Sequence, residues 1–364
     1  MQDSLLTTLD QLLAFDAPSG HEQKIANFTL KKLQKLGFQT KKDKKGNVIG
    51  YLPGNGKRPF LLSAHLDRVP PGRANIPIKK DGIIKSNGKT NLGADNASGI
   101  AIILEALQHI IVNKLPHPAL IIVFTVEEEI GLRGARAVNL NKYKQLHGIV
   151  YDNAGSAGKL ITKGASYIAF DVTITSKPSH PGKDLSQSRN AFAIIQEIDW
   201  MLGKSDTGKT RINIGTTVIG TARNIIPGNA IMAGEIRSFL TEKQLKQKIN
   251  RLEKNIKSVC KKYQATYTLT TNVHAKSYIV SEKAPLVQAY KQVLKKRKKT
   301  FVSETTFIAS DTSVFRAELN YPVVTISTGV EDEHTTKEWI RISDLTTLTQ
   351  DLIHLLQMFG KQSI

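Results

Sequence analysis

Short apolar runs that alternate with helical patterns constrain the fold of this chain more than any other feature. The runs span residues 59–64, 119–126, 148–151 and 322–328, with the sequences PFLLSA, ALIIVFTV, GIVY and PVVTIST. Each run is short and rich in aliphatic residues, as buried strands are. Helical patterns occupy residues 4–15, 21–37 and 96–111. The alternation predicts a mixed, mainly parallel α/β sheet flanked by helices.

Residues 165–277 show a different order of predicted strands and helices. Strand patterns occupy residues 166–175, 211–220, 229–238 and 266–273, and helical patterns occupy residues 189–202 and 242–263. Their order, βαββαβ, is the ferredoxin-like arrangement. The second helical pattern places Leu245, Ile249, Leu252, Ile256 and Val259 on one stripe, with Thr241 as the capping residue. The sequence therefore predicts that this block is inserted into a larger domain formed by residues 1–164 and 278–364.

Side chains that can bind metal ions follow all four apolar runs. They are His65 and Asp67, the triplet Glu127–Glu129, Asp152, and His334, and Asp95 precedes a helix. Any one of these acids alone would be read as a helix cap or a solvated residue. In an open α/β sheet, however, ligands bind beyond the carboxyl ends of the strands. Acids crowded there repel one another, and a divalent cation removes the conflict.

The ligand types favour particular metals. Imidazole and carboxylate donors suit zinc, with cobalt and manganese left open, whereas calcium requires oxygen donors alone. Cys260 is the only cysteine, which excludes a thiolate cluster and a disulfide framework. There are enough donors for two metals about 3.5 to 4 Å apart, bridged by one carboxylate. One glutamate then remains as a candidate general base.

Several motifs together resemble the M20 family of metallopeptidases, most closely its peptidase T (tripeptidase) branch. They are SAHLDRV, GADNASGIA, FTVEEEIGLRGA, YDNAG, SHPG, NIIPGNA with EIRS, and GVEDEHTTKEWI, and their order covers nearly the whole chain. The resemblance implies a zinc-dependent catalytic domain with an inserted lid and dimerisation domain. It also implies hydrolysis of short peptides by metal-activated water, with two divalent metal ions as cofactors.

The resemblance also implies individual roles. His65 and Asp152 would bind one metal, Glu129 and His334 would bind the other, and Asp95 would bridge them. Asp67 would orient the His65 ring, and Glu128 would be the general base, which leaves Glu127 as a solvated acid. In the lid, His180 would stabilise the oxyanion, Arg237 would bind a substrate carboxylate, and Asn224 would contact the substrate.

Two departures from the family pattern stand out. Asn96 occupies a position where the family commonly has a second acid, often across a cis peptide bond, and this leaves the metal preference open. The Pro-Asp pair that precedes the glutamates in many tripeptidases is also missing, which weakens a strict tripeptidase assignment. A deacylase or carboxypeptidase acting on N-acyl amino acids or dipeptides therefore remains the alternative function.

The net charge of +20 raises one further alternative, a nucleic-acid-binding protein on a hydrolase scaffold. The basic runs at residues 41–45 and 294–299 lack the interleaved aromatic residues of a single-strand groove, which argues against it. The acidic amino terminus and the absence of a long apolar stretch predict a cytoplasmic protein with no membrane partner. The expected partners are a short peptide and a second copy of the chain, paired through the lid.

Overall fold

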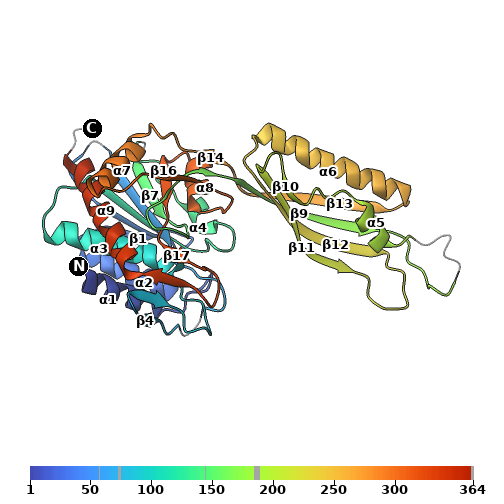
Figure 1. The fold of residues 1–364 in the computed structure, drawn as a ribbon, viewed down its shortest axis with the longest axis horizontal. Helices are drawn as coiled ribbons and strands as arrows, with labels where there is room; N and C mark the ends of the chain where they lie inside the picture. Colours follow the sequence, from blue (N-terminus) through green and yellow to red (C-terminus); the bar gives the residue numbers. More distant parts are fainter. Residues whose placement is uncertain (57, 73–74, 144, 184–188, 362–364) are drawn as a thin grey trace. The chain divides into compact units, whose positions relative to one another are not determined.

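The computed structural model describes residues 1–56, 58–72, 75–143, 145–183 and 189–361. The chain forms two compact units. The first consists of Met1–Lys163, Ile279–Thr305 and Ser310–Ile364, and the second of Gly164–Tyr278 with the short segment Thr306–Ala309. Figure 1 shows the helices and strands of both units.

The first unit is built on a mixed sheet with the strand order β1-β2-β6-β3-β7-β16-β8-β14, in which β15 also pairs with β8. Four central strands match the apolar runs and are parallel to one another: β3 (Phe60–His65), β6 (Leu120–Thr125), β7 (His147–Tyr151) and β16 (Val323–Ile326). Every residue of these strands is buried. The outer strands are β1 (Gln39–Lys42), β2 (Val48–Leu52), β8 (Leu160–Gly164), β14 (Tyr278–Ile279) and β15 (Ser303–Thr306). The predicted mainly parallel α/β fold is confirmed.

Helices cover this sheet. They are α1 (Gln2–Leu13), α2 (Gln23–Lys35), α3 (Ala94–Val112), α4 (Arg133–Ala137), α7 (Pro285–Lys296), α8 (Asp311–Ala317) and α9 (Ile342–Lys361). Helix α3 packs against α1, α9 and β3 (Figure 1), and most of its residues are buried. Across the described ranges, none of the helices combines the length and apolar character needed to cross a membrane.

A small second sheet links two distant segments of the first unit. Its strand order is β17-β18-β5-β4, with β17 (Val330–Glu331), β18 (Trp339–Arg341), β5 (Ile83–Lys85) and β4 (Ile78–Lys80). Strand β18 is antiparallel to β5, and Ile340 lies opposite Ile84. This pairing holds the chain that follows His334 beside the chain that leads to Asp95.

The second unit has the ferredoxin-like arrangement. Its elements are β9 (Ser166–Thr175), α5 (Ala191–Glu197), β10 (Gly203–Ser205), β11 (Thr210–Ile219), β12 (Asn229–Ser238), α6 (Glu242–Lys262) and β13 (Thr266–Ala275). The strand order is β10-β11-β12-β9-β13, with every pair antiparallel. This is the predicted βαββαβ order with one short strand, β10, added.

Helix α6 forms as its sequence predicts. The side chain of Thr241 accepts a hydrogen bond from the backbone N–H of Gln244. The side-chain oxygen of Gln244 in turn accepts a hydrogen bond from the backbone N–H of Thr241, which completes a capping box. The apolar stripe packs into the core of the unit, although Ile249 is only partly buried. Helix α5 is shorter than predicted, because the chain is extended at Ile198 and the Trp200 ring N–H donates to the carbonyl of Ile195.

The segment Thr306–Ala309 belongs to the second unit through Phe307. The Phe307 ring lies 4.5 Å from the ring of Phe239, and the Arg211 guanidinium lies 3.9 Å from its centre. The Phe307 carbonyl accepts a hydrogen bond of 3.0 Å from Arg237 Nη1. The second unit is therefore completed by residues that follow it by almost thirty positions in the chain.

His147 makes the stability of the first unit depend on pH. It begins β7, is 6% exposed, and its ring lies 4.9 Å from the ring of Phe359. Burial and the nearby Arg58 lower the pKa of His147 to about 4. Because the unfolded chain binds this proton more readily, the stabilisation is complete above about pH 6.5 and is lost as the pH falls towards 4.

Between pH 7 and pH 4, we expect the free energy of unfolding of the wild-type protein to fall by about 2 kcal/mol more than that of a His147→Gln variant. This value allows for solvent screening. Urea unfolding of both proteins at the two pH values measures this difference. Equal losses in the two proteins would contradict the assignment of the effect to His147.

Candidate metal centre

Three adjacent strands bring the polar residues together. The parallel pairing of β3 with β6 places His65 opposite Thr125, so the acids that follow β6 lie next to His65. Strand β7 pairs with the other side of β3 and ends just before Asp152. Asp95 lies at the start of α3, and His334 lies in the loop between β17 and β18. The predicted convergence therefore follows from the strand order β6-β3-β7.

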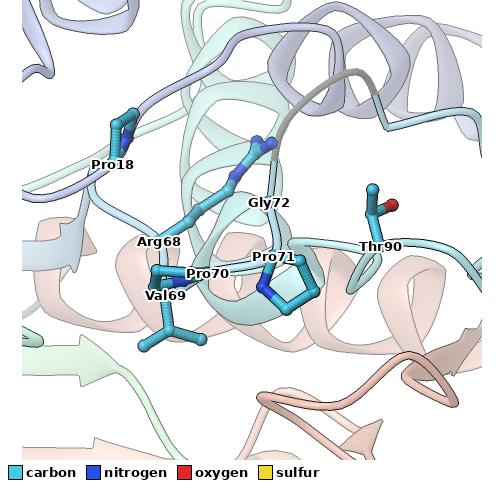
Figure 2. Close-up of a pocket in the computed structure, with 7 residues that line it drawn as sticks. All are labelled: Pro18, Arg68, Val69, Pro70, Pro71, Gly72 and Thr90. Atoms are coloured by element: carbon cyan, nitrogen blue, oxygen red, sulfur yellow. The ribbon is translucent and has the colours of Figure 1, made fainter.

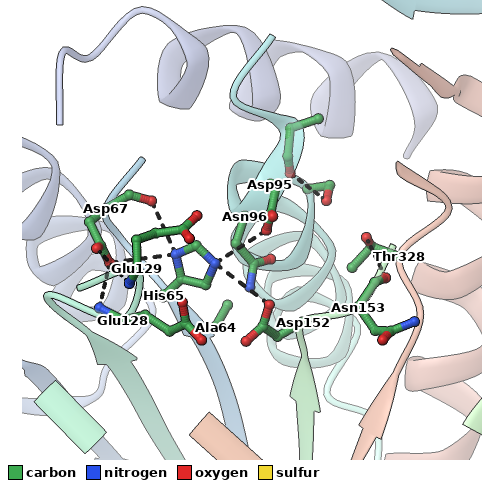
Figure 3. Close-up of polar contacts among 12 residues, drawn as sticks. Ala64, His65, Asp67, Asp95, Asn96, Glu128, Glu129, Asp152, Asn153 and Thr328 are labelled. Atoms are coloured by element: carbon green, nitrogen blue, oxygen red, sulfur yellow. Dashed lines mark hydrogen bonds and ion pairs between the residues drawn. The ribbon is translucent and has the colours of Figure 1, made fainter. Parts of the chain in front are cut away.

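His65 lies at the centre of the cluster, with Asp67 on one side and two acids on the other (Figure 3). Its Nδ1 lies 3.0 Å from the backbone carbonyl oxygen of Asp67. Its Nε2 lies 3.2 Å from Asp95 Oδ1 and 3.6 Å from Asp152 Oδ1. The ring nitrogen that faces the acids is thus the one left free by the contact with Asp67.

Asp67 is fully buried and holds the segment that carries the glutamates. Its two carboxylate oxygens accept hydrogen bonds from the backbone N–H groups of Glu128 and Glu129, at 3.0 and 3.1 Å. Ser19 donates a further hydrogen bond of 2.7 Å to Asp67. The Asp67 carboxylate is 3.5 Å from His65 Nδ1, so the closer contact to the ring comes from the Asp67 carbonyl. Asp67 therefore fixes the backbone of both glutamates as well as the His65 ring.

Asp95 lies between two histidines. Its Oδ1 faces His65 Nε2, and its Oδ2 is 3.2 Å from His334 Nε2. His334 Nε2 is also 3.0 Å from Glu129 Oε1. The arrangement forms two neighbouring clusters that share one carboxylate, as a bridging ligand would.

The charges in the cluster shift the pKa values of its members strongly. Burial raises the pKa of Glu128, Glu129 and Asp152, and neighbouring carboxylates raise it further. Burial alone would lower the pKa of His65, but Asp152, Asp67 and Asp95 together raise it well above the ordinary value. Hydrogen bonds to Asp95 and Glu129 raise the pKa of His334 to about 10. The site thus holds a concentration of negative charge that attracts positive charge.

The residues present fit a divalent metal ion. Two sets, His65 with Glu128 and Asp152, and His65 with Asp95 and Glu129, each place one ligand atom per residue within 4.8 Å of the others. Asp152 Oδ2 is buried and has no hydrogen-bond partner among the described residues. The donors are imidazole and carboxylate, and Cys260 lies in the core of the second unit. The first set includes Glu128, which was predicted to be the general base and not a ligand. His334 lies next to Asp95 and Glu129 of the second set.

Glu127 differs from its prediction. It was expected to be a solvated acid, but its side chain is only 14% exposed, and one oxygen lies 2.6 Å from Lys45 Nζ. Its other oxygen is 3.5 Å from Arg133 Nη1. The prediction was wrong because the sequence around Glu127 does not reveal this ion pair, since Lys45 lies 82 positions earlier in the chain. The Glu127 carboxylate is therefore paired with two cationic side chains, Lys45 and Arg133.

Asn96 is joined to Asp95 by a cis peptide bond. Its side-chain amide donates a hydrogen bond to the carbonyl of Tyr151, the last residue of β7. An ionised carboxylate has no hydrogen to donate to this carbonyl. The asparagine thus links the Asp95 segment to the strand that precedes Asp152.

Two buried acids near the cluster were not identified from the sequence. Asp311 is 1% exposed and accepts a hydrogen bond from the hydroxyl of Thr125, and burial raises its pKa to about 7. Glu338 is also 1% exposed and accepts hydrogen bonds from the backbone around Asp95. Neither residue follows an apolar run, so the pattern that identified the other acids does not extend to them.

The three predicted lid residues lie in the second unit. His180 is exposed and its Nδ1 accepts a hydrogen bond from the backbone N–H of Gly182, and Asn224 is exposed. The Arg237 guanidinium makes two 3.2 Å hydrogen bonds to Glu235 and lies 3.9 Å from the centre of the Tyr167 ring. Arg237 is therefore already paired with a carboxylate. The roles of these three residues in catalysis stay predictions.

A cavity of about 360 Å³ lies beside the segment that follows Asp67 (Figure 2). Pro18, Val69, Pro70 and Pro71 give it a largely apolar lining. Arg68 contributes to its wall, while its guanidinium donates hydrogen bonds to the carbonyls of Leu12, Leu13 and Phe15. Arg68 thus satisfies carbonyl groups at the carboxyl end of α1.

The fold and the cluster together define a metal-dependent peptidase. The chain belongs to peptidase family M20/M25/M40, whose profile matches residues 61–358. The predicted family is confirmed, and with it the prediction that the chain is an enzyme that hydrolyses peptides.

Individual relatives and solved structures are similar to this chain over nearly its whole length. The chain is similar to aminopeptidase PepT from Bacillus cereus, with 26% identity, a TM-score of 0.92 and 99% of each chain covered. A tripeptidase from Staphylococcus aureus is 24% identical, with a TM-score of 0.94 and coverage of 100% of this chain and 99% of that one, a similarity of fold. The uncharacterised protein YqjE from Bacillus subtilis is 25% identical over 98% of both chains.

Proposed function

We propose that the protein is an aminopeptidase that removes residues from short peptides, with a tripeptidase-like preference, and that it depends on two divalent metal ions. The observation that carries the proposal is Asp95, whose two carboxylate oxygens each face a different histidine. The similarity to an aminopeptidase PepT supports the substrate class.

In this proposal, His65 and Asp152 hold one metal, Glu129 and His334 hold the other, and Asp95 lies between them. The mixture of imidazole and carboxylate donors favours zinc, with cobalt and manganese as alternatives. When bound, the metals acidify a water molecule and polarise the scissile carbonyl group.

Glu128 is the general base in the proposed reaction. It takes a proton from the attacking water and gives it to the leaving amine as the peptide C–N bond breaks. Asp67 contributes by fixing the Glu128 backbone through the 3.0 Å hydrogen bond.

We assign the second unit the roles of lid and dimerisation surface. His180 would stabilise the developing oxyanion, and Asn224 would contact the substrate. Arg237 would bind a substrate carboxylate in bidentate fashion, in competition with its present partner Glu235.

A substrate panel tests the proposed function. Protein loaded with Zn²⁺, Co²⁺ or Mn²⁺ is incubated with tripeptides, dipeptides, amino-terminally blocked peptides and N-acetylated amino acids, and products are followed by mass spectrometry. We expect release of amino-terminal residues from tripeptides with a free amine, and none from the chelator-treated protein. Cleavage of acylated substrates alone would instead establish a deacylase. Inactivity on every substrate, combined with salt-sensitive DNA binding, would favour the nucleic-acid alternative.

A further inference from the structure

Glu338 connects two loops of the candidate metal centre. It lies four residues after His334 in the chain, and its side chain reaches the loop that carries Asp95. Its Oε2 accepts hydrogen bonds from the backbone N–H groups of Leu92 and Gly93, both at 2.8 Å. Its Oε1 accepts a 2.9 Å hydrogen bond from the backbone N–H of Asp95 itself.

The backbone of Glu338 is fixed as well as its side chain. Its carbonyl accepts a 2.9 Å hydrogen bond from the N–H of Ser86, and β18 pairs with β5 directly after it. The side chain is 1% exposed, so water does not compete for the three N–H groups. Glu338 therefore spans 243 positions of sequence to tie the Asp95 loop to the His334 loop.

The hydrogen bonds of Glu338 specifically require a carboxylate. All three partners are N–H donors, and a carboxylate offers acceptors on both oxygens. Glutamine at this position would turn an amide NH₂ towards one or two of those donors and leave them unpaired in a buried place. The negative charge of the carboxylate is also stabilised by its position at the amino-terminal end of α3, where backbone N–H groups lack helical partners.

The Asp95 loop has little room to adapt if these hydrogen bonds are lost. Gly93 has a φ of +75°, and a Cβ atom there would lie 2.7 Å from Arg68 Nε. The Arg68 guanidinium is in turn held by the carbonyls at the end of α1. The loop is thus confined between Arg68 and Glu338.

We propose that Glu338 is a positioning residue for the metal site formed by Asp95, Glu129 and His334. By holding the backbone N–H of Asp95 and the segment that follows His334, it sets the distance between these two ligands. The inference rests on the proposed function, because it presupposes that these residues bind a metal. Residues that orient metal ligands typically contribute about 10- to 100-fold to metal affinity.

The test is a calorimetric titration of metal-free wild type, Glu338→Gln and Asp351→Asn proteins with Zn²⁺. Asp351, which lies on α9, is a matched control, because it is a 2% exposed acid in the same unit and is ion-paired with Arg297. We expect two equivalents of Zn²⁺ to bind wild type and the control with similar affinities. In Glu338→Gln we expect one of the two sites to weaken about 10- to 100-fold, and excess Zn²⁺ to restore kcat.

Each outcome bears on a different claim. If wild type itself does not bind two equivalents, the proposed metal centre fails. If wild type binds two and Glu338→Gln binds them equally well, only the role of Glu338 fails. If the Glu338→Gln variant folds poorly, the same titration is made with a Glu338→Asp variant, which keeps the charge on a shorter side chain. If both variants stay unfolded at saturating Zn²⁺, Glu338 serves the fold as a whole and the inference is overturned.

Discussion

Replacing Glu128 by glutamine is expected to lower kcat by at least about 10³-fold while both metals remain bound, since general base catalysis contributes roughly 10²- to 10⁴-fold. Glutamine is nearly the same size and cannot accept the proton of the attacking water. The backbone hydrogen bond from Glu128 to Asp67 involves no side-chain atom of Glu128, so the segment should keep its position. Steady-state kinetics and elemental analysis of the same protein sample measure the two quantities.

The neighbouring Glu127→Gln variant provides the matched control. Glu127 is paired with Lys45 and Arg133, so we expect its replacement to change kcat less than about 3-fold, as for loss of a partly exposed ion pair. If Glu127→Gln abolished activity and Glu128→Gln did not, the two glutamates would have been assigned in the wrong order. If Glu128→Gln lost its metals, Glu128 would be a ligand, as its place beside His65 and Asp152 also allows.

The Asp95→Asn variant is expected to retain at most one metal equivalent and to lose at least about 10³-fold in kcat/KM, because no bridging carboxylate remains between the two sites. The amide keeps one oxygen, which can face either His65 or His334 and not both. Metal content after dialysis, together with kcat/KM at fixed free Zn²⁺, measures the effect.

Asp43→Asn is the control for the loss of a negative charge. Asp43 Oδ1 accepts three backbone N–H hydrogen bonds in the turn between β1 and β2. We expect the Asp43 variant to be less stable and to keep both metals. Two tightly bound metals in Asp95→Asn would contradict the bridging role.

The parts of the fold that were predicted from the sequence are those with strong local patterns. The four central strands are continuous apolar runs, and α6 combines an apolar stripe with a capping residue. The short strands β1 and β4 were not predicted, because their residues are mostly exposed and carry no apolar alternation. They are strands because of their partners, β2 and β5, and a local pattern does not contain the partner.

The same distinction applies to the site. His65 and Asp152 were found because they follow buried strands, where the sheet topology fixes their direction. Asp311 and Glu338 were identified only from the structure, because each is buried and hydrogen-bonded to residues far away in the chain. The environment of Glu127 was misjudged for the same reason.

The placement of Phe307 bears on how such proteins can exchange parts in evolution. A transfer of residues 164–278 alone into another scaffold would leave Arg211 and Phe239 without the ring of Phe307, which contacts both of them. The exposed apolar surface would invite aggregation. Recombination that preserves the second unit therefore has to transfer two separate stretches of the gene. This makes transfer of the unit as one contiguous gene segment unfavourable.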